Sequence, residues 1–546
     1  MEKIVDKSTF REEIRPKLKR EGRTIALCHG VFDLVHPGHI IHLQQAKQMA
    51  DILVVSITAA EYVRKGPGRP YFNDEMRLKV LEALECVDYV MLSEGYTVDD
   101  IVENVEPDLY IKGEEYAKES DDITGKITAE RELVERHDGK VAYTTGEVFS
   151  STKLINTALS GLPEDVIQYM QGFITQYSME DIRKYAEKAE KLKVLVVGDV
   201  IIDKYTYCIV HGLMSKDTGY SSGLEYSEEY LGGAAAVARH LSSFTENVTL
   251  MSIVGNEEEM RLRLFDGLAD KMRLKFTYSS DFPTIIKHRY LTRNAKREEY
   301  RKIFSINNIP ETMAYEQEAK EEFCRGLAEK LDESDVVFLC DFGHGLVDDR
   351  VKELIQEKAK YLVLNCQTNS TNYGLNIITK YSRADAFTLD QKELKLAYPM
   401  DLSDERTALK KLSEHLGCGG WLTRGSEGAY GIENRKDQEC PEIYRRQDIY
   451  ECEDIHKHEN IHEGKDIYEC KGIHECPAFT LTVKDTVGAG DAFYSIAGLY
   501  AAAGAPTELG TFMGNIAGAL GANIVGNREA VEKVNVLKYA GTLLNI

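Results

Sequence analysis

Two histidines, His36 and His39, flank a Pro-Gly dipeptide in the stretch CHGVFDLVHPGHIIHLQQAK, residues 28–47. The stretch begins as an apolar run typical of a strand and continues with helical spacing, which places both histidines at the start of a helix. The unpaired N–H groups and the dipole of a helix N-terminus favour an anion such as phosphate. Imidazole donors there can stabilise charge that develops on a phosphorus centre. The pattern indicates phosphate chemistry in which the substrate supplies the attacking oxygen.

A second glycine-punctuated turn, VKDTVGAGDAF at residues 483–493, opens another apolar helix. The three residues Gly488, Ala489 and Gly490 would expose successive N–H groups and form an anion hole. Asp491 would repel an anion, and it fits a general base that takes a proton from an attacking hydroxyl group. Such a turn is also common as a plain tight corner, so its function depends on the surrounding sequence.

The elements that must position these turns alternate between strand and helix patterns. From residue 24, apolar runs of strand length are separated by helical segments, which predicts an α/β fold with a doubly wound, parallel, Rossmann-like sheet. We place this first domain at residues 1–160. Residues 161–190 are predicted to be a helical linker, either a spacer or dimerisation helices. A second α/β domain begins with KLKVLVVGDVIIDKY and covers residues 191–546.

The second domain contains a polar, low-complexity insertion at about residues 432–476. Its segment DIYECEDIH (448–456) recurs as DIYECKGIH (466–474), an imperfect duplication too short for a repeat architecture. We interpret it as a mobile loop inserted between two strands. Its cysteines and histidines leave zinc binding as an alternative, although paired metal-ligand spacing is missing.

Composition narrows the possible partners. The 546-residue chain carries a net charge of −23, which disfavours nucleic acid, and it has no apolar run long enough to span a membrane. The N-terminus lacks the apolar core of a signal peptide, and eleven cysteines in such a chain are expected to be reduced thiols. We therefore expect a cytoplasmic protein that binds small molecules.

Four segments together resemble the cytidylyltransferase-like nucleotidyltransferases over residues 23–157. They are GVFDLVHPGHIIHLQQAK, RPYFNDEMRLKVLEALECVDYV, PDLYIKGEEY and TTGEVFSSTKLI. The resemblance is closest to heptose-phosphate adenylyltransferases and glycerol-phosphate cytidylyltransferases. It implies that a nucleoside triphosphate and a phosphorylated sugar or polyol react to give a nucleotide-linked product and pyrophosphate.

The same resemblance implies roles for individual residues. His36 and His39 would hold the triphosphate in the transition state. The other implied nucleotide- and phosphate-binding residues are Gly30, Phe32, Asp33, Gly38, Lys47, Arg77, Lys112, Ser151 and Thr152. Lys47 could instead be a solvated helix lysine and Asp33 a structural turn residue, while His29 and His42 are expected to be structural. Class I tRNA ligases also place two histidines near a helix start, but the acidic charge and the short domain disfavour them.

Segments of the second domain resemble the ribokinase-like (PfkB) sugar kinases, from VVGDVIIDKY and YLGGAAAVARHL through LCDFGHG and LTRGSEGAYG to TVKDTVGAGDAF. The resemblance implies that the residues Gly488 to Gly490 stabilise the transferring phosphoryl group and that Asp491 is the base. The implied sugar-binding residues are Asp199, Asp203, Gly232 and Gly233, with a Lys or Arg of KHRYLTRN near phosphate.

Three departures from the kinase pattern leave its activity open. Ala236 stands where many members have Asn, and residues 365–387 are polar where a short Asp-Pro-Lys loop is usual. DQKE (390–393) replaces Asn-x-x-Glu, so Glu393 is expected to approach Mg²⁺ only through water.

These patterns predict a bifunctional enzyme of activated-sugar synthesis, with the transferase first and the kinase second. It would use ATP for the kinase step, ATP or CTP for the transferase step, a sugar or polyol phosphate, and Mg²⁺. Bifunctional heptose-phosphate kinase/adenylyltransferases have the reverse domain order. The alternative is a nucleotidyltransferase whose kinase-like domain is an inactive ligand-binding or dimerisation module. A homodimer is expected in either case.

Overall fold

The computed structural model describes most of the chain, and every structural statement below refers to this part: residues 3–63, 70–95, 97–113, 126–145, 162–216, 218–256, 267–293, 300–309, 315–369, 372–399, 404–433, 472–480 and 483–545. The chain divides into two compact units, Met1–Glu180 with Glu532–Ile546, and Asp181–Val531. The division falls inside the predicted linker and assigns the C-terminal helix α18 (Lys533–Leu543) to the first unit. Each unit is described by itself.

The first unit contains a five-stranded sheet in the order β3-β2-β1-β4-β5, and every pair of neighbouring strands is parallel. This order confirms the predicted Rossmann-like sheet, in which the chain starts at the centre and winds outward in both directions. Its strands are β1 (Ile25–Gly30), β2 (Ile52–Thr58), β3 (Tyr89–Ser93), β4 (Leu109–Gly113) and β5 (Lys140–Thr144).

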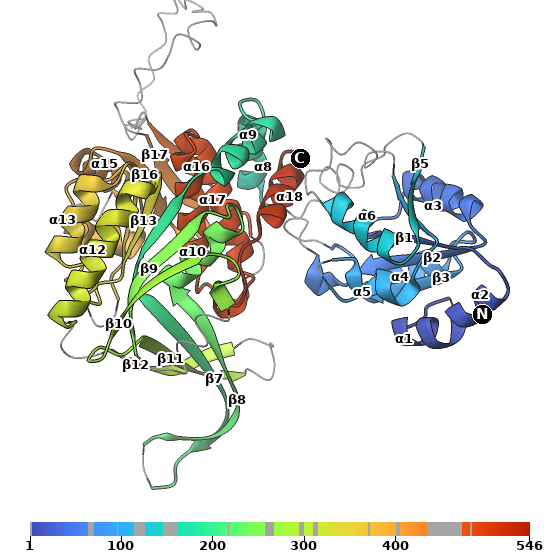
Figure 1. Ribbon diagram of the computed structural model, residues 1–546, viewed down its shortest axis with the longest axis horizontal. Coiled ribbons are helices and arrows are strands. Elements are labelled where there is room, and N and C mark those ends of the chain that lie inside the picture. The colour runs from blue at the N-terminus through green and yellow to red at the C-terminus, as the bar shows by residue number, and fades with distance from the viewer. Residues whose placement is uncertain are drawn as a thin grey trace, which may run out of the picture. The chain divides into compact units, whose positions relative to one another are not determined.

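Helices cover both faces of this sheet because each strand buries side chains in both directions (Figure 1). On one face, Ala26 and Cys28 of β1 pack with α3 (Pro37–Met49) and α4 (Asp74–Glu82). On the other, Ile25 and Leu27 pack in a core with α5 (Asp99–Val105) and α6 (Lys126–Arg136). The remaining helical segments of this unit before the linker are α1 (Lys7–Thr9), the π-helical turn η1 (Phe10–Ile14), α2 (Arg15–Arg20) and the 3₁₀ turn η2 (Ala60–Tyr62). The segment predicted as a linker holds α8 (Glu164–Phe173) and α9 (Met179–Glu190).

The second unit is built on a nine-stranded sheet in the order β10-β9-β6-β13-β14-β15-β16-β17-β18. All pairs from β10 to β16 are parallel, and β17 and β18 complete the sheet as antiparallel strands. The strands are β6 (Val194–Gly198), β9 (Val248–Gly255), β10 (Arg273–Ser279), β13 (Val336–Asp341), β14 (Leu362–Cys366), β15 (Ala386–Asp390), β16 (Gly419–Thr423), β17 (Ala429–Ile432) and β18 (Ile473–Cys476).

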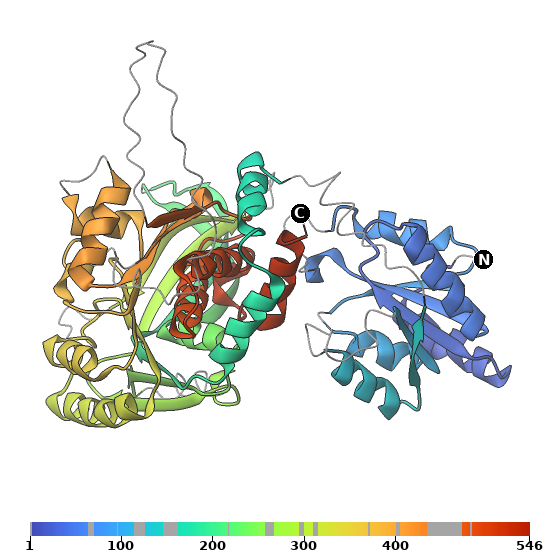
Figure 2. The same ribbon diagram turned by 90° about the horizontal axis from the view of Figure 1, so that it is seen from above.

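Helices also cover both faces of the large sheet (Figure 2). One face contacts α10 (Ala234–Ser242), α16 (Ala489–Ala502) and α17 (Thr507–Gly521). The other contacts α12 (Gln317–Glu333), α14 (Gln391–Ala397) and α15 (Glu405–Leu416), with α13 (Asp349–Lys358) packed on α12. The 3₁₀ turns of this unit are η5 (Ile378–Lys380), η7 (Gly425–Glu427) and η10 (Val525–Asn527).

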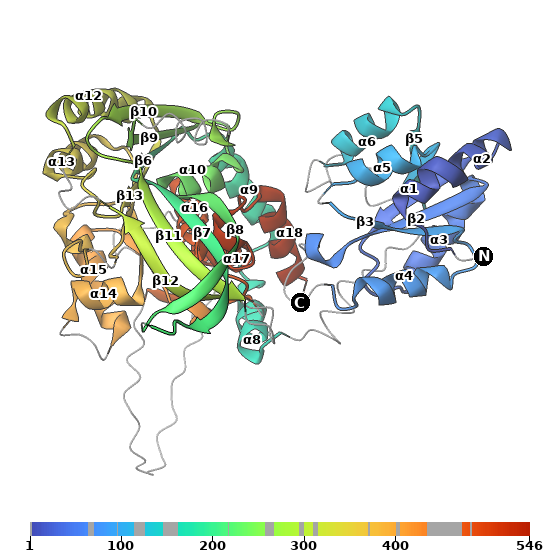
Figure 3. The same ribbon diagram turned by 90° about the horizontal axis from the view of Figure 1, so that it is seen from below.

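A separate four-stranded sheet lies in the same unit, in the order β12-β11-β7-β8 (Figure 3). Its strands are β7 (Val200–Leu213), β8 (Tyr220–Gly233), β11 (Ile285–Arg293) and β12 (Tyr300–Asn308). Gly198 ends β6 in the large sheet and Val200 begins β7 in the small one, so the chain changes sheets at Asp199.

The strands on either side of the predicted insertion, β17 and β18, pair antiparallel from Ala429↔Cys476 to Ile432↔Ile473. The two ends of the predicted insertion are thus neighbouring strands of one sheet, and β18 lies inside the predicted bounds. Residues 434–471, with most of the duplicated segment and most of the cysteines and histidines of the zinc alternative, lie outside the described residues. No helix in the described part of the chain is both long and apolar enough to cross a membrane.

Candidate active sites

The histidine pair of the first unit lies where β1 ends and α3 begins, at the carboxyl edge of the sheet. The connecting turn is tight. Phe32 has a left-handed backbone with φ 46°, unusual for a bulky residue. A Cβ at Gly30 would lie 3.1 Å from the Phe32 ring, so glycine lets the ring pack on the strand end. Strain of this kind concentrates at functional sites.

The two histidines cap the helix reciprocally. Nδ1 of His36, the N-cap residue, accepts a hydrogen bond from the backbone N–H of Gly38 at 3.1 Å. The backbone N–H of His36 donates in turn to Nδ1 of His39 at 3.4 Å. An imidazole nitrogen that accepts carries no proton, so each neutral ring must carry its proton at Nε2. The cap therefore turns both histidines into Nε2–H donors.

Burial favours the neutral form of His36. His36 is buried, and this desolvation lowers the pKa of its imidazole below the ordinary 6.5. The rings of His36 and His39 are 4.0 Å apart between centroids, and the ring of Phe32 lies 5.3 Å from that of His39. Nε2 of His36 is buried and has no hydrogen-bond partner among the described residues. A buried donor without a partner is costly, and an anionic ligand at the helix N-terminus would satisfy it.

Asp33 fixes the neighbouring loop. Its carboxylate, almost fully buried, accepts hydrogen bonds from the backbone N–H groups of Tyr71 at 2.9 Å and Phe72 at 3.0 Å. This geometry fits the turn-shaping role expected from the sequence.

Arg77, predicted to neutralise phosphate, is buried in the wall of the turn. It is 1 % exposed, and its guanidinium joins three segments around the turn. Its acceptors are the carbonyl oxygens of Val31 (2.7 Å), Thr58 (2.9 Å) and Phe72 (3.1 Å) and the carboxylate of Asp74 (2.5 Å). A buried guanidinium with these partners stabilises the wall of the site and is not exposed to a triphosphate.

Lys47 is also not brought to the histidine pair. It lies eleven residues beyond His36 on α3, roughly 16 Å along the helix axis. There its ammonium group pairs with Asp88 at 2.6 Å and donates to the carbonyl oxygen of Asp51. These partners lie beside the amino ends of β2 and β3, so Lys47 forms an ion pair away from the histidines, and its phosphate contact stays a prediction.

Lys112 stands near the carboxyl end of β4, next to β1, and forms an ion pair with Glu130 at 2.8 Å. His42, on the second turn of α3, contacts Oγ1 of Thr144 at the end of β5 through Nδ1 at 2.7 Å. Burial and the charge of Lys112 lower the pKa of His42. His42 thus links α3 to β5, the strand that precedes Ser151 and Thr152, which is a structural role. Those two residues lie outside the described residues.

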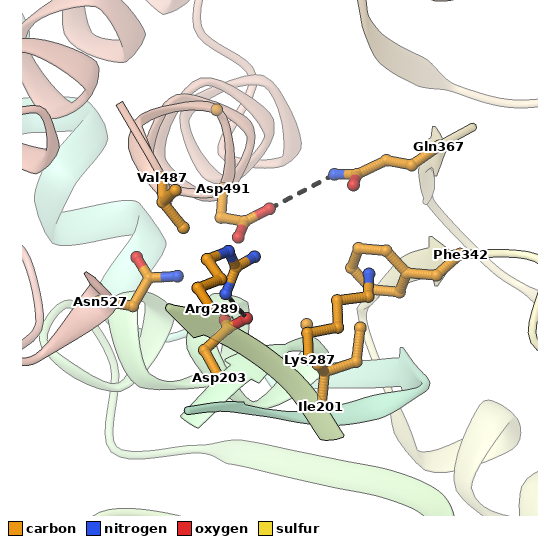
Figure 4. A pocket seen from close by; sticks show the side chains of 12 residues that line it. Ile201, Asp203, Lys287, Arg289, Phe342, Gln367, Val487, Asp491 and Asn527 are labelled. Carbon is orange, nitrogen blue, oxygen red and sulfur yellow. Dashed lines mark hydrogen bonds and ion pairs between the residues drawn. The ribbon is translucent and has the colours of Figure 1, made fainter. Parts of the chain in front are cut away.

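The second unit contains a cavity of about 210 Å³ between the start of α16 and the four-stranded sheet (Figure 4). The predicted residues Gly488, Gly490 and Asp491 line it, together with Asp203 and Gly233. Ala489 is the first residue of α16, and Gly488 is its N-cap with φ 88°. The remaining lining residues are Ile201, Lys287, Arg289, Phe342, Gln367, Val487 and Asn527.

Asp491 has the electrostatics of a proton acceptor. Burial, with a smaller contribution from the charge of Asp203, raises the pKa of its carboxyl to about 6. A base with a pKa near the working pH combines a populated charged form with a useful affinity for a proton. The start of α16 lies beside Asp491, and a helix N-terminus favours an anion.

Asp203 and two glycines shape the opposite wall. Asp203 is buried and forms an ion pair with Arg289 of the neighbouring strand β11. A Cβ at Gly232 would lie 2.2 Å from Oδ2 of Asp203, so only glycine permits this carboxylate to lie there. Gly233 has φ +61°, where a side chain would also meet the carbonyl oxygen of Asp199 at 2.5 Å.

Asp199, predicted to bind sugar, is not among the residues that line the cavity. It lies at the crossing between the two sheets and is 2 % exposed. Burial and the charge of Asp341 raise the pKa of its carboxyl to about 7. Both carboxylate oxygens of Asp199 are buried, and its sugar-binding role stays a prediction.

Lys287 and Arg289 are the cations that line the cavity, both from the KHRYLTRN segment. Arg289 is neutralised by Asp203, whereas Lys287 lies over the ring of Phe342 at 5.7 Å. Burial lowers the pKa of Lys287, and the charges of Asp203 and Asp199 oppose this shift. Lys287 is thus the lining cation that offers its charge to a ligand.

Two polar lining residues that were not predicted from the sequence are Gln367 and Asn527. Gln367 donates from Nε2 to Oδ1 of Asp491 at 3.4 Å, and Asn527 makes a second side-chain hydrogen bond to the same carboxylate. Gln367 belongs to the polar segment 365–387 that departs from the kinase pattern, which is the one signal that could have identified it.

Glu393 lies at the start of α14 in a capping box with Asp390. Its carboxylate accepts from the backbone N–H groups of Asp390 at 2.9 Å and Thr368 at 3.2 Å. Burial and the charge of Asp390 raise the pKa of Glu393 to about 8. A nearby cation would favour its charged form, so this carboxylate fits contact with Mg²⁺ through water, although the described residues contain no cluster of three metal-ligating side chains.

Solved structures similar to this chain include phosphofructokinase-2 from Escherichia coli and ribokinase from Thermotoga maritima. The first is 13 % identical, with a TM-score of 0.45, over 64 % of this chain and 99 % of that chain. The second is 15 % identical, with a TM-score of 0.44, over 63 % of this chain and 99 % of that chain.

Curated relatives match about a quarter of this chain. The bifunctional protein HldE of Syntrophotalea carbinolica is 35 % identical over 140 residues, 25 % of this chain and 27 % of the relative. The bifunctional protein HldE of Citrifermentans bemidjiense is 38 % identical over 122 residues, which are 22 % of this chain and 24 % of the relative. This chain therefore spans about a quarter of the length of these relatives. The family model described as cytidylyltransferase-like matches residues 27–157, which contain β1 through β5 and the histidine pair.

Proposed function

We propose that the chain is a bifunctional enzyme of activated-sugar synthesis. The first unit would transfer a nucleotidyl group from ATP or CTP to a sugar or polyol phosphate. The second would phosphorylate a sugar or sugar phosphate with ATP. The observation that carries the proposal is the reciprocal cap, which presents two Nε2–H donors on rings 4.0 Å apart at the start of α3.

In the transferase step, a phosphate oxygen of the acceptor attacks the α-phosphorus of the nucleoside triphosphate, and the bond to pyrophosphate breaks. Negative charge increases on the oxygens around that phosphorus and on the leaving group. Donors from His36 and His39, with the N-terminal amides of α3, would stabilise this charge more strongly in the transition state than in the ground state. No protein nucleophile is needed.

In the kinase step, a hydroxyl oxygen of the acceptor attacks the γ-phosphorus of ATP, and ADP leaves. Asp491 would take the hydroxyl proton, and the amides of Gly488 to Gly490 would stabilise the transferring group. The retained aspartate, its raised pKa and its place in a cavity with Lys287 support an active kinase over an inactive module.

Both reactions would take Mg²⁺ with the nucleotide, because the metal neutralises phosphate charge. In the second unit, Glu393 would approach it through water. The product of the kinase step would carry the phosphate that the transferase step consumes. A homodimer remains a prediction.

The test is a product screen of the full chain with Mg²⁺, ATP or CTP, and a panel of sugars and sugar phosphates. Pyrophosphate release with one nucleotide and ADP formation in the presence of a sugar or sugar phosphate are expected. Asp491→Asn should abolish ADP formation and leave pyrophosphate release intact. A wild-type chain that forms pyrophosphate but no ADP would leave the inactive-module alternative.

A further inference from the structure

Asp491 lies between two carboxamide side chains that come from distant parts of the chain (Figure 4). Gln367 follows β14 and donates to Oδ1 of Asp491. Asn527 belongs to η10, and its side chain approaches the same carboxylate from the other side. We propose that Gln367 and Asn527 are positioning residues that hold the Asp491 carboxylate charged and oriented toward the cavity. This inference rests on the proposed function insofar as Asp491 is the base.

Hydrogen bonds of its own backbone fix the position of Gln367. Its N–H donates to the carbonyl oxygen of Asp341 at 2.8 Å, and its carbonyl oxygen accepts from Nδ2 of Asn376 at 2.9 Å. Asn376 is buried and also donates to the carbonyl oxygen of Asp341 at 3.1 Å, while Lys380 donates to its Oδ1 at 2.7 Å. The polar segment that replaces the usual kinase loop thus fixes an amide donor next to the base.

The side of Asn527 is held by strain and by packing. Asn527 is buried with a left-handed φ of 57°. The guanidinium of Arg239 donates to its carbonyl oxygen. A Cβ at Gly488 would lie 1.6 Å from Oδ1 of Asn527, so only glycine at the N-cap leaves room for this amide. A strained asparagine packed against the helix cap fits a functional constraint.

One carboxylate joins the two loops on this side. Asp485 accepts from the backbone N–H of Val487 at 3.0 Å and from that of Gly526 at 3.0 Å. Asp485 therefore connects the segment that enters α16 to the segment that carries Asn527. Asn527 can then act on Asp491 without a change of backbone.

The hydrogen bonds from the two amides lower the pKa of Asp491, against the larger effect of burial that raises it. Other ionisable groups around Asp491 act in both directions. They are Asp203 on β7, Lys287 and Arg289 on β11, Cys340 on β13, Glu393 on α14 and Tyr494 on α16. An amide donor is neutral at every pH and adds no titration of its own, so its removal has a predictable sign.

The variants are chosen to remove the donor and keep the shape. In Gln367→Met the side chain keeps nearly the same volume and loses its N–H donor. Asn527→Gly removes the amide and suits the left-handed backbone, so the fold is expected to persist. Gln317→Met is the matched control, because Gln317 is exposed on α12 and bonds only to Glu321 at 3.1 Å.

The measurement is a pH titration of the full chain labelled with ¹³C at the aspartate carboxyl carbon, with the Asp491 signal assigned by its loss in Asp491→Asn. We expect the pKa of Asp491 to rise by about half a pH unit or more in Gln367→Met and in Asn527→Gly, and to stay unchanged in Gln317→Met. Each residue is tested by its own variant, and an unshifted titration overturns its assignment. This outcome is independent of turnover. A wild-type chain that forms no ADP would refute the kinase function, while the titration would still decide whether the amides hold Asp491.

Discussion

The backbone N–H of His36 donates to Nδ1 of His39, while Nδ1 of His36 accepts from the backbone of the same helical turn. A capping box is usually built from a hydroxyl or carboxylate side chain and a glutamate three residues later. In this chain two imidazoles take both places. Capping and proton placement are then one event, because the structure that starts α3 also decides which nitrogen of each ring can donate to a ligand.

The first prediction concerns the tautomers themselves. Both rings should be neutral at pH 7.5 and carry the proton at Nε2, since Nδ1 of each accepts from backbone N–H. Nitrogen chemical shifts of the ¹⁵N-histidine-labelled chain report this directly, with the two signals assigned by His36→Asn and His39→Gln. A proton at Nδ1 of either ring would contradict the reciprocal cap.

The second prediction separates capping from catalysis at His36. Asparagine is a good N-cap residue, so His36→Asn should cost less than about 1 kcal/mol of stability. It lacks the Nε2–H donor, and the rate of pyrophosphate release should fall at least about 100-fold. Thermal unfolding and a pyrophosphate assay on the same preparation measure both effects. A variant that keeps the wild-type rate would show that His36 only caps the helix.

The third prediction tests whether Lys47 forms a structural ion pair with Asp88 or contacts phosphate. If Lys47 only pairs with Asp88, Lys47→Met should lower stability by about 0.5–1 kcal/mol and leave pyrophosphate release unchanged. Asp88→Asn is the matched control, because it breaks the same pair from the other side and should have a similar effect. A large loss of rate in Lys47→Met alone would restore the phosphate-binding role.

The fourth prediction concerns the acid stability of the second unit. His240 on α10 is buried, accepts from the backbone N–H of Val531 at 3.0 Å, and has its pKa lowered to about 3 by burial and by Arg239. The unfolded chain binds a proton near pH 6.5 and the folded unit does not, so the stabilisation present above pH 6.5 is lost as pH falls toward 3.

Between pH 6.5 and 5 this linkage amounts to about 2 kcal/mol. His240→Asn, which keeps an acceptor and cannot titrate, should lose that much less stability than the wild type over this interval. Denaturant unfolding at the two pH values measures the difference. Parallel losses in both proteins would show that His240 is protonated in the folded unit.

The sequence predicts well the features that a few neighbouring residues determine. The histidine cap, the glycine turn before Asp491 and the alternation that gives the parallel sheet order each depend on a short stretch of chain. The insertion between β17 and β18 is visible because its composition changes abruptly.

Features that depend on distant partners are not predicted. Lys47 is at the wrong end of α3 for a phosphate, and its partner Asp88 lies 41 residues away. The guanidinium of Arg77 donates hydrogen bonds to carbonyl oxygens of three separate segments. Gln367 meets Asp491 across 124 residues, and no local pattern records that the end of β14 lies beside the start of α16. The crossing of the chain between two sheets at Asp199 is equally invisible, because β6 and β7 form one apolar run.

The central claim is that the capped imidazole pair stabilises phosphorus during nucleotidyl transfer. The most direct measurement is the rate of pyrophosphate release by the full chain with Mg²⁺, its preferred nucleotide and its preferred sugar phosphate, compared with His39→Ala. We predict a rate at least about 100-fold lower in the variant, the scale of a lost oxyanion donor, with the Asp491-dependent formation of ADP unaffected. Equal rates of pyrophosphate release in the two proteins would contradict the account.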